Sequence, residues 1–462
     1  MTTSDRKESK EEEKVIIDNP GKGSCGFYAI AIGLIPALKQ EIMEGKTEQP
    51  DSLFQKFLPP EILKPPVDEY RLAACKKALK EEIVCYEYKK SYNWPQEVLR
   101  SLRRRRTKGK EAMGLDPFLH RADKILREKL ITHREEKINQ ILDQKNHSTR
   151  VEEIKNDAFL KEFIQVFNHY YCGVPGEMLV ESLNVMQFEP LKKQIQQYAL
   201  QCRQALPEGT QPPEIKQPGL DIAEKELNGL LSIICNPPQK DKRHSVVMET
   251  PAQLNPSSHY AKYIRHLSDI ATYANDIDMS QLSTLLNVQI LDGTRNLNKG
   301  VAHPVAKVVI NFVAGFTSLT NHFNTQQSKK EFNEGKEQSA LMKKFKKHVD
   351  FDKYPLLSQK EILEVAREMT TGRFSAVRTL FSNHEQRAFI AELKLMVKQS
   401  KHQQIMEMLS TREVPLGSHS SLINLGQKYL KMRQQEQLIH LQNTMKEPAP
   451  VADAKRLAAG LR

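Results

Sequence analysis

The chain has 462 residues and carries 69 Lys and Arg against 57 Asp and Glu, for a formal net charge of +12. A prior of about 150 residues per domain predicts about three domains. Acidic and basic residues are interleaved, so the positive charge alone does not indicate nucleic-acid binding. The basic run 103–110 (RRRRTKGK) has no nucleic-acid-binding motif beside it. We interpret it as a solvated loop or helix end, with contact to nucleic acid or anionic lipid as the alternative.

The cysteine pattern and the apolar runs exclude several further classes. The six cysteines form no CxxC pair and no His/Cys grouping at zinc spacing, so we expect reduced thiols and no metal. The polar residues 1–14 exclude a conventional signal peptide. The longest apolar run, which starts at Gly26, is shorter than the roughly 20 residues that a membrane span needs. We therefore expect a soluble protein with no transmembrane segment.

The predicted elements begin with a disordered segment, 1–14, and a short β-branched strand, 14–18 (KVIID). Asn19, Pro20 and Gly21 then predict a turn. The segment that starts at Cys25 predicts a buried helix, which we expect to end at Pro36.

Residues 37–235 have an overwhelmingly helical pattern. The clearest stretch is 125–142, where apolar residues recur three and four positions apart. The best strand candidate within this region is 184–190. Two segments rich in proline and polar residues, 206–219 and 236–258, predict loops.

Strand-forming sequence returns after these loops. Residues 276–293 predict a short helix that runs into a strand at 288–291 and a turn at Asp292–Gly293. A second strand is predicted at 306–313, and 315–327 predicts a loop followed by a short extended segment.

The chain is helical again from about residue 329. Two segments, Ser358–Glu361 and Ser382–Glu385, have the pattern of a capping box before an apolar run. A stripe at helical spacing predicts core packing, with a binding groove as the alternative; its members are Phe389, Leu393, Met396 and Val397.

Together these elements predict an α+β, mostly helical protein. Strand-forming segments lie mainly at 14–18 and 288–325, which predicts one small α/β core assembled from both ends of a large helical insertion. Loop closure costs grow slowly with length, so such an insertion is tolerable. The predicted domains are a disordered N-terminus (1–14), a discontinuous core (15–36 and 245–328), a helical insertion (37–244), a C-terminal helical domain (329–446) and a flexible tail (447–462).

Cys25 has the features of an activated thiol. Gly21 and Gly23 allow a tight backbone before it, in which successive N–H groups can converge on an oxyanion. A helix that starts at Cys25 stabilises a thiolate through its N-terminal dipole. The small Ser24 and Gly26 are expected to leave the thiol open to substrate. A structural cysteine at a loop–helix junction is the alternative.

The candidate base lies about 300 residues further on. His322 and Asn324 flank Phe323, and on an extended segment residues i and i+2 share a face. The imidazole would then be oriented by an amide, with Phe323 in the core, as in Cys-His-Asn sites. A surface His-Phe-Asn is the alternative, and His303 is a rival base.

Three blocks in order, GKGSCGFYAI, DIDMSQLSTLLNVQIL and FTSLTNHFN, resemble the signature blocks of OTU-family cysteine proteases. The chain keeps Gly23, Cys25, the aromatic pair at 27–28, Ala29 and the His-Phe-Asn at 322–324. The resemblance spans roughly 15–36 and 260–327, and it implies a papain-type α/β core.

One position departs from the family pattern. The family commonly has Asp three residues before its Cys, where this chain has Lys22. The nearest upstream acid is Asp18, and this spacing, with a long helical insertion after the Cys helix, is similar to the OTU-like deubiquitinases of Legionella. That similarity implies that Asp18 orients His322 and that the insertion helps to bind ubiquitin, with Asn324 as the alternative third member.

The resemblance implies a thiol-dependent isopeptidase, with His322 as base and acid, Cys25 as nucleophile and the backbone N–H groups of Gly23, Ser24 and Cys25 as the oxyanion loop. It implies ubiquitin, polyubiquitin and ubiquitinated host proteins as partners, no cofactor, and no nucleic acid. It also implies an effector that a bacterium secretes without an N-terminal signal peptide and that acts in the host cytoplasm, with membrane association through a partner left open.

Two other classes remain. A non-catalytic helical adaptor that binds a host protein is one, because most of the chain lies outside the predicted core. A papain-like deamidase or acyltransferase is the other, because it needs the same Cys and His.

Overall fold

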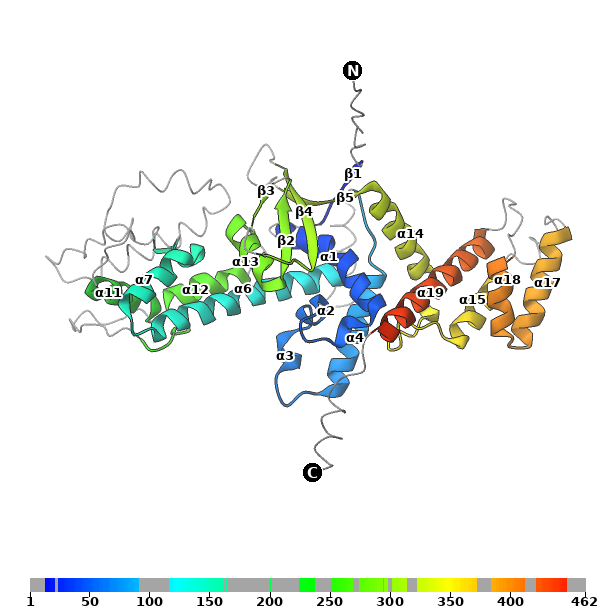
Figure 1. Cartoon of the computed structure of the whole chain (residues 1–462), viewed down its shortest axis with the longest axis horizontal. Coiled ribbons are helices and arrows are strands. Elements are labelled where there is room, and N and C mark those ends of the chain that lie inside the picture. The colour runs from blue at the N-terminus through cyan, green and yellow to red at the C-terminus, as the bar shows by residue number, and fades with distance from the viewer. Residues whose placement is uncertain are drawn as a thin grey trace, which may run out of the picture. The chain divides into compact units, whose positions relative to one another are not determined.

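The structure is a computed structural model in which helices dominate around one small mixed sheet (Figure 1). The predicted α+β, mostly helical class is therefore confirmed. The structure describes residues 13–20, 24–90, 116–161, 163–164, 200, 224–236, 251–268, 274–293, 295–297, 301–313, 322–371, 384–411 and 421–446. The basic run 103–110, the strand candidate 184–190, the loop 206–219 and the termini 1–12 and 447–462 lie outside these residues.

The sheet has five strands in the order β1-β5-β4-β2-β3. Their bounds are β1 Lys14–Ile17, β2 Val288–Asp292, β3 Arg295–Asn296, β4 Ala306–Val313 and β5 His322–Ser328. β1 runs antiparallel to β5, with Ile17 opposite Thr325. β2 runs parallel to β4, with Val288 opposite Ala306, and antiparallel to β3. One sheet thus contains strand-forming segments from two distant parts of the chain, as predicted.

The strands form because alternate side chains bury one face. In β2, Val288 and Ile290 are buried, and in β4, Val308 and Ile310 are buried. The predicted turn after β2 is confirmed at Gly293, whose φ of +59° lies in the left-handed region that favours glycine. The predicted strands at 14–18, 288–291 and 306–313 match β1, β2 and β4 closely.

Helix α1 (Cys25–Glu44) begins where predicted, but the predicted end at Pro36 is wrong. Proline inside a helix costs about 3 kcal/mol. Pro36 is exposed, and the turns beyond it bury Leu38 and Ile42, each worth about 1.5–3 kcal/mol, which offsets that cost. By length and composition alone, α1 is apolar enough to cross a membrane, and 67% of its most apolar 18 residues is buried inside the fold.

The chain divides into two compact units. The terminal unit comprises residues 1–18, 31–120 and 325–462, and the central unit comprises 19–30 and 121–324. The boundaries of these units differ from those of the domains predicted from the sequence. The predicted domain boundaries stay a prediction.

The central unit holds a helical layer with its own core. Its helices are α6 (Pro117–Asp143, whose first turn belongs to the terminal unit), α7 (His147–Asn156), α11 (Glu224–Cys235), α12 (His259–Arg265), a 3₁₀ turn (His266–Ser268) and α13 (Asp276–Leu286). Helices α6, α7, α11 and α12 lie close together (Figure 1), and their side chains share one hydrophobic cluster. Phe159 stacks on Tyr263, and Phe163 meets Tyr260 edge to face within this cluster. The helical pattern predicted at 125–142 falls within α6.

The terminal unit is helical outside its strands. Its helices are the last part of α1, α2 (Leu53–Lys56), α3 (Pro60–Leu63), α4 (Glu69–Val84), α14 (Lys329–Phe345), α15 (Gln359–Thr371), α17 (His384–Lys398), α18 (His402–Thr411) and α19 (Ser421–Lys446), with 3₁₀ turns at Lys46–Glu48 and Lys346–His348. α15 packs against α17, α18 and α19. Phe389 and Leu393 of α17 are buried, and Met396 and Val397 are half-buried, which confirms the predicted core stripe.

The capping box predicted at Ser358 forms only in part. The Ser358 hydroxyl accepts a hydrogen bond from the Glu361 N–H at 3.0 Å. The Glu361 carboxylate accepts instead from the Tyr429 hydroxyl and from Arg433 Nε, so it is committed to the core. The Glu361 side chain therefore binds buried partners instead of capping the start of α15. Ser382 of the second predicted box lies outside the described residues.

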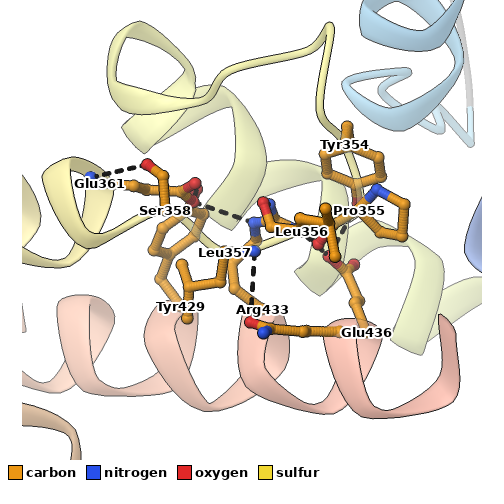
Figure 2. Close-up of polar contacts among 10 residues, drawn as sticks. Tyr354, Pro355, Leu356, Leu357, Ser358, Glu361, Tyr429, Arg433 and Glu436 are labelled. Atoms are coloured by element: carbon orange, nitrogen blue, oxygen red, sulfur yellow. Dashed lines mark hydrogen bonds and ion pairs between the residues drawn. The ribbon is translucent and has the colours of Figure 1, made fainter. Parts of the chain in front are cut away.

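Arg433 of α19 organises a buried polar network, the Arg433 network, which Figure 2 shows between α19 and residues 354–361. Its guanidinium donates to Glu361 Oε1 at 2.9 Å and to Glu436 Oε2 at 2.6 Å. It also donates to the carbonyls of Pro355 at 3.0 Å and Leu356 at 3.1 Å. Both carboxylates receive tyrosine hydroxyls, from Tyr429 on Glu361 at 2.5 Å and from Tyr354 on Glu436 at 2.8 Å.

Candidate active site around Cys25

Cys25 is the first residue of α1, which confirms that the helix starts at the candidate nucleophile. The Ser24 carbonyl accepts the Tyr28 N–H at 2.9 Å and so closes the first helical turn. In a trans peptide the N–H points opposite to the carbonyl, so the Cys25 N–H points away from the helix. The first N–H groups of a helix have no intrahelical partner and can bind an anion.

The expectation that Cys25 is open to substrate is wrong for this structure. Cys25 and Ser24 are each 1% exposed, and Gly26 is buried as well. Small neighbours do not guarantee access, because the surrounding elements pack closely against this segment. A nucleophilic role therefore requires that the thiol become accessible when a substrate binds.

Gly26 marks the point where the three sequence blocks meet. A Cβ atom added to Gly26 would lie 2.8 Å from Ala274 Cβ and 2.8 Å from Met279 Cε. It would also lie 3.6 Å from Cδ2 of Phe323. Distances below 3.0 Å exclude any side chain unless a neighbour shifts, so glycine allows the cysteine helix, the segment entering α13 and β5 to approach closely.

Asn19 joins two of these blocks, and sequence reasoning missed it. The residue is fully buried, and its Nδ2 donates to the carbonyl of Phe323 at 2.6 Å and to that of Cys25 at 3.4 Å. The backbone next to His322 is thereby held to the first residue of α1. In the sequence, Asn19 stands before Pro-Gly and reads only as part of a turn, so no local signal indicates this role.

His322 is the first residue of β5, on an extended segment as predicted. Phe323 is 5% exposed, and its ring centroid lies 5.0 Å from that of Phe312, which confirms that it turns into the core. Asn324 lies on the face of the strand opposite to Phe323. The His322 side chain lies outside the part of the chain that the structure describes, so its distance to Cys25 stays a prediction.

Asp18 and Asn324, the two candidates for the residue that orients His322, differ in burial and hydrogen bonding. Asn324 Oδ1 is buried and has no hydrogen-bond partner among the described residues, so it is an acceptor suited to an imidazole N–H. Asp18 is half-buried and donates its N–H to the Lys89 carbonyl at 3.1 Å. It belongs to the terminal unit, and its reach to His322 stays a prediction.

The remaining candidates are a rival base and the oxyanion loop. His303 is exposed before β4, where its carbonyl accepts from Asn287 Nδ2 at 3.3 Å. Gly21, Lys22 and Gly23 lie outside the described residues. Of the predicted oxyanion loop, the structure therefore describes only Ser24 and Cys25.

A buried polar network, the Ser24 network, adjoins the cysteine. The Ser24 hydroxyl donates to Asp123 Oδ2 at 3.1 Å and accepts from Arg127 Nη2 at 3.0 Å. Arg127 Nε donates to Asp123 Oδ1 at 2.8 Å, and Nη1 donates to the Leu267 carbonyl at 2.8 Å. The guanidinium also lies 4.3 Å from the ring centroid of Phe27. Burial and the nearby Asp123 carboxylate raise the pKa of Tyr28 far above its usual range.

Among the described residues, no group of three or more His, Cys, Asp or Glu side chains could hold a metal ion. The four described cysteines, 25, 75, 85 and 235, are free thiols. Burial raises the pKa of the Cys85 thiol to about 11, so that cysteine is a poor nucleophile near neutral pH.

Comparisons with protein-family models, with curated proteins and with solved structures found no match to this chain. The candidate site therefore stands on its own residues and geometry.

Proposed function

We propose that the protein is a cysteine-type isopeptidase with an OTU-like core that removes ubiquitin from host proteins or from polyubiquitin chains. The observation that carries the proposal is the meeting of three distant segments at Gly26 and Asn19. It places the helix start that bears Cys25 against the strand that begins at His322. A buried structural cysteine does not require that meeting point.

The proposed roles follow from the positions of these groups. His322 takes the proton of Cys25, and the thiolate attacks the carbonyl carbon of the C-terminal glycine of ubiquitin. The N–H of Cys25, directed out of the helix, binds the oxyanion together with N–H groups of residues 23 and 24. His322 then protonates the departing lysine amine, and water hydrolyses the thioester. Asp18 or Asn324 holds the imidazole in the required orientation.

A ubiquitin C-terminal electrophile that labels thiols tests the nucleophile. We expect wild-type protein and Cys75→Ala to be labelled, and Cys25→Ala not to be labelled. Cys75 is the control, because it is a reduced thiol on α4 that is less buried than Cys25. Labelling that survives in Cys25→Ala would exclude Cys25 as the nucleophile.

Matched variants test the base and the third member. We expect His322→Ala to abolish cleavage of polyubiquitin and His303→Ala to retain it; the reverse result would transfer the base to His303. Asp18→Asn and Asn324→Ala differ in which hydrogen bond to the imidazole they remove. The variant with the larger fall in kcat identifies the orienting residue.

The burial of Cys25 favours one second candidate, a helical adaptor that binds a host protein without catalysis. In that case the Cys25→Ala variant keeps the biological effect in host cells, and the wild-type protein releases no ubiquitin from its substrates. A deamidase or acyltransferase would modify a protein without releasing ubiquitin, which mass spectrometry of the product distinguishes. Both outcomes would overturn the isopeptidase proposal.

A further inference from the structure

We infer that Asp123 and Arg127 of α6 are positioning residues for Cys25, which act through Ser24. The inference rests on the proposed function for its catalytic consequence, but its structural part does not. α6 lies within the segment that the sequence predicts as a helical insertion, so the inference makes part of that insertion a component of the active site.

The contacts define the orientation of the Ser24 side chain. Its hydroxyl has one proton, which goes to Asp123, and it accepts the proton of Arg127 Nη2. Arg127 and Asp123 also bind each other, and the Tyr28 side chain is a further hydrogen-bond partner of Ser24, so the four groups form one network with 1–2% exposure. A hydroxyl held by both a donor and an acceptor cannot rotate without losing one of them.

The orientation of Ser24 passes directly to Cys25. The Ser24 carbonyl is already bound by the Tyr28 N–H, so one peptide plane is held from both ends, by the side chain and by the helix. That plane contains the Cys25 N–H, and it sets the position of the Cys25 Cα atom. Arg127 also packs over Phe27 two residues later, so α6 contacts the chain on both sides of the cysteine.

Arg127 is itself anchored by a group outside the cysteine segment. Nη1 donates to the carbonyl of Leu267, in the turn after α12. The bond to Leu267 therefore holds the Arg127 guanidinium in place independently of Ser24. A shift of the cysteine segment would break the bond between Arg127 and Ser24. Lysine has a single ammonium and cannot make three such bonds in the planar directions of a guanidinium.

The same helix offers a matched control in Arg134. Arg134 and Arg127 are each 2% exposed, and each pairs with a carboxylate, Asp278 in the case of Arg134. Arg134 also packs over an aromatic ring, that of Phe159. Among the described residues, its hydrogen bonds, ion pair and ring contact go to Asp278, Gln281 and Phe159 rather than to residues 24–28, so Arg134→Lys reproduces the loss of a buried guanidinium that does not bind the cysteine segment.

The experiment compares Arg127→Lys, Ser24→Ala and Arg134→Lys in the full chain, at a temperature where all three are folded by circular dichroism. Steady-state cleavage of a fluorogenic ubiquitin substrate gives kcat and KM. We expect kcat to fall about tenfold or more in Arg127→Lys and Ser24→Ala, since small misplacements of reacting groups cost up to about a hundredfold. KM should change less than about twofold, and Arg134→Lys should keep most of kcat.

A second readout does not need the proposed reaction. The rate of alkylation of Cys25 by iodoacetamide, resolved by peptide mass spectrometry, reports the position of the thiol in any case. We expect alkylation to rise about fivefold or more in Arg127→Lys, because a loosened segment exposes a buried thiol. Equal alkylation in Arg127→Lys and Arg134→Lys would overturn the inference. Absence of ubiquitin cleavage by the wild type, with the alkylation difference present, would overturn the proposed function alone.

Discussion

The two compact units use the same device, a buried arginine that binds carboxylates and backbone carbonyls, with different consequences. In the terminal unit, Arg433 binds two carboxylates, Glu361 and Glu436, and two carbonyls. In the central unit, Arg127 binds the Asp123 carboxylate, the Leu267 carbonyl and the Ser24 hydroxyl. Burial of charge is costly in both, so each network depends on having all its hydrogen bonds.

The difference lies in the carboxylates that each arginine is seen to bind and in what each network contacts. Arg433 binds two carboxylates, and burial raises the pKa of Glu436 above its usual range despite the adjacent Arg433 and the nearby Lys39. Its contacts join α15, α19 and the segment before α15. The Ser24 network joins Arg127 to Asp123, and Ser24 itself directly precedes the Cys25 thiol. The same chemistry can therefore hold helices together or hold a reactive side chain in place.

The largest expected effect is in the terminal unit. Arg433→Met leaves two carboxylates buried without their cation, and we expect a loss of about 3–5 kcal/mol in the free energy of unfolding. Urea denaturation measures it. Lys428→Met, on the same helix but in an exposed pair with Glu337, is the control and should cost less than about 1 kcal/mol. Equal losses in the two variants would refute a special role for Arg433.

A smaller loss is expected from Arg127→Met. It removes the cation beside Asp123, and this carboxylate keeps the hydrogen bond from Ser24, so we expect a loss of about 2–3 kcal/mol in the free energy of unfolding. The same urea titration measures it, with Lys124→Met as the exposed control on α6. A loss larger than that of Arg433→Met would contradict the comparison of the two networks.

Removal of the Tyr429 hydroxyl tests whether the Glu361 carboxylate needs this hydrogen bond for stability. Glu361 Oε2 is buried and has no partner among the described residues, so Tyr429→Phe leaves this carboxylate with Arg433 as its remaining side-chain donor. We expect a loss of about 1–2 kcal/mol by thermal or urea unfolding. Tyr70→Phe, at an 85% exposed position, should leave stability unchanged. A neutral Tyr429→Phe would show that the carboxylate does not need the tyrosine.

The smallest expected effect is a pH dependence near the Arg433 network. Burial lowers the pKa of Lys39 from 10.5 to about 8, partly offset by Glu436. The unfolded chain then binds the proton more tightly than the folded one between these values. The destabilisation is complete below about pH 8 and is released as the pH rises toward 10.5.

Lys39→Met isolates this contribution. The wild type should gain about 1 kcal/mol relative to Lys39→Met between about pH 7.5 and about pH 9, as measured by urea denaturation at each pH. Lys428→Met again provides the control for a lysine outside the core. Parallel pH profiles for the wild type and Lys39→Met would contradict the lowered pKa.

Much of the local structure could be predicted from sequence because it depends on short-range patterns. The alternation in β2 and β4 and the helix–strand junction after α13 follow from side-chain periods of two and 3.6 residues. The prediction failed at Pro36, where a local rule was outweighed by the burial of Leu38 and Ile42 from distant contacts. It failed again at the thiol, whose exposure depends on everything packed around it.

The candidate site divides in the same way. Cys25 at a helix start and His322 at a strand start were visible as residue types in suitable local patterns. Asn19 and Arg127 were not, because an asparagine before proline or an arginine within a helical pattern has no distinguishing local signal. Their roles depend on Phe323, Ser24 and Leu267, which are far from them in the chain.

The sequence by itself determined the helical and extended segments, the helix start at Cys25 and the order of the three blocks, since these depend on neighbouring residues and backbone preferences. Only the tertiary structure decided that β1 pairs with β5, that Gly26 admits Phe323, and that Ser24 is held by α6. Such contacts form when apolar surface and polar groups from distant segments are buried together. The free energy of that burial depends on both segments, so neither local sequence predicts it alone.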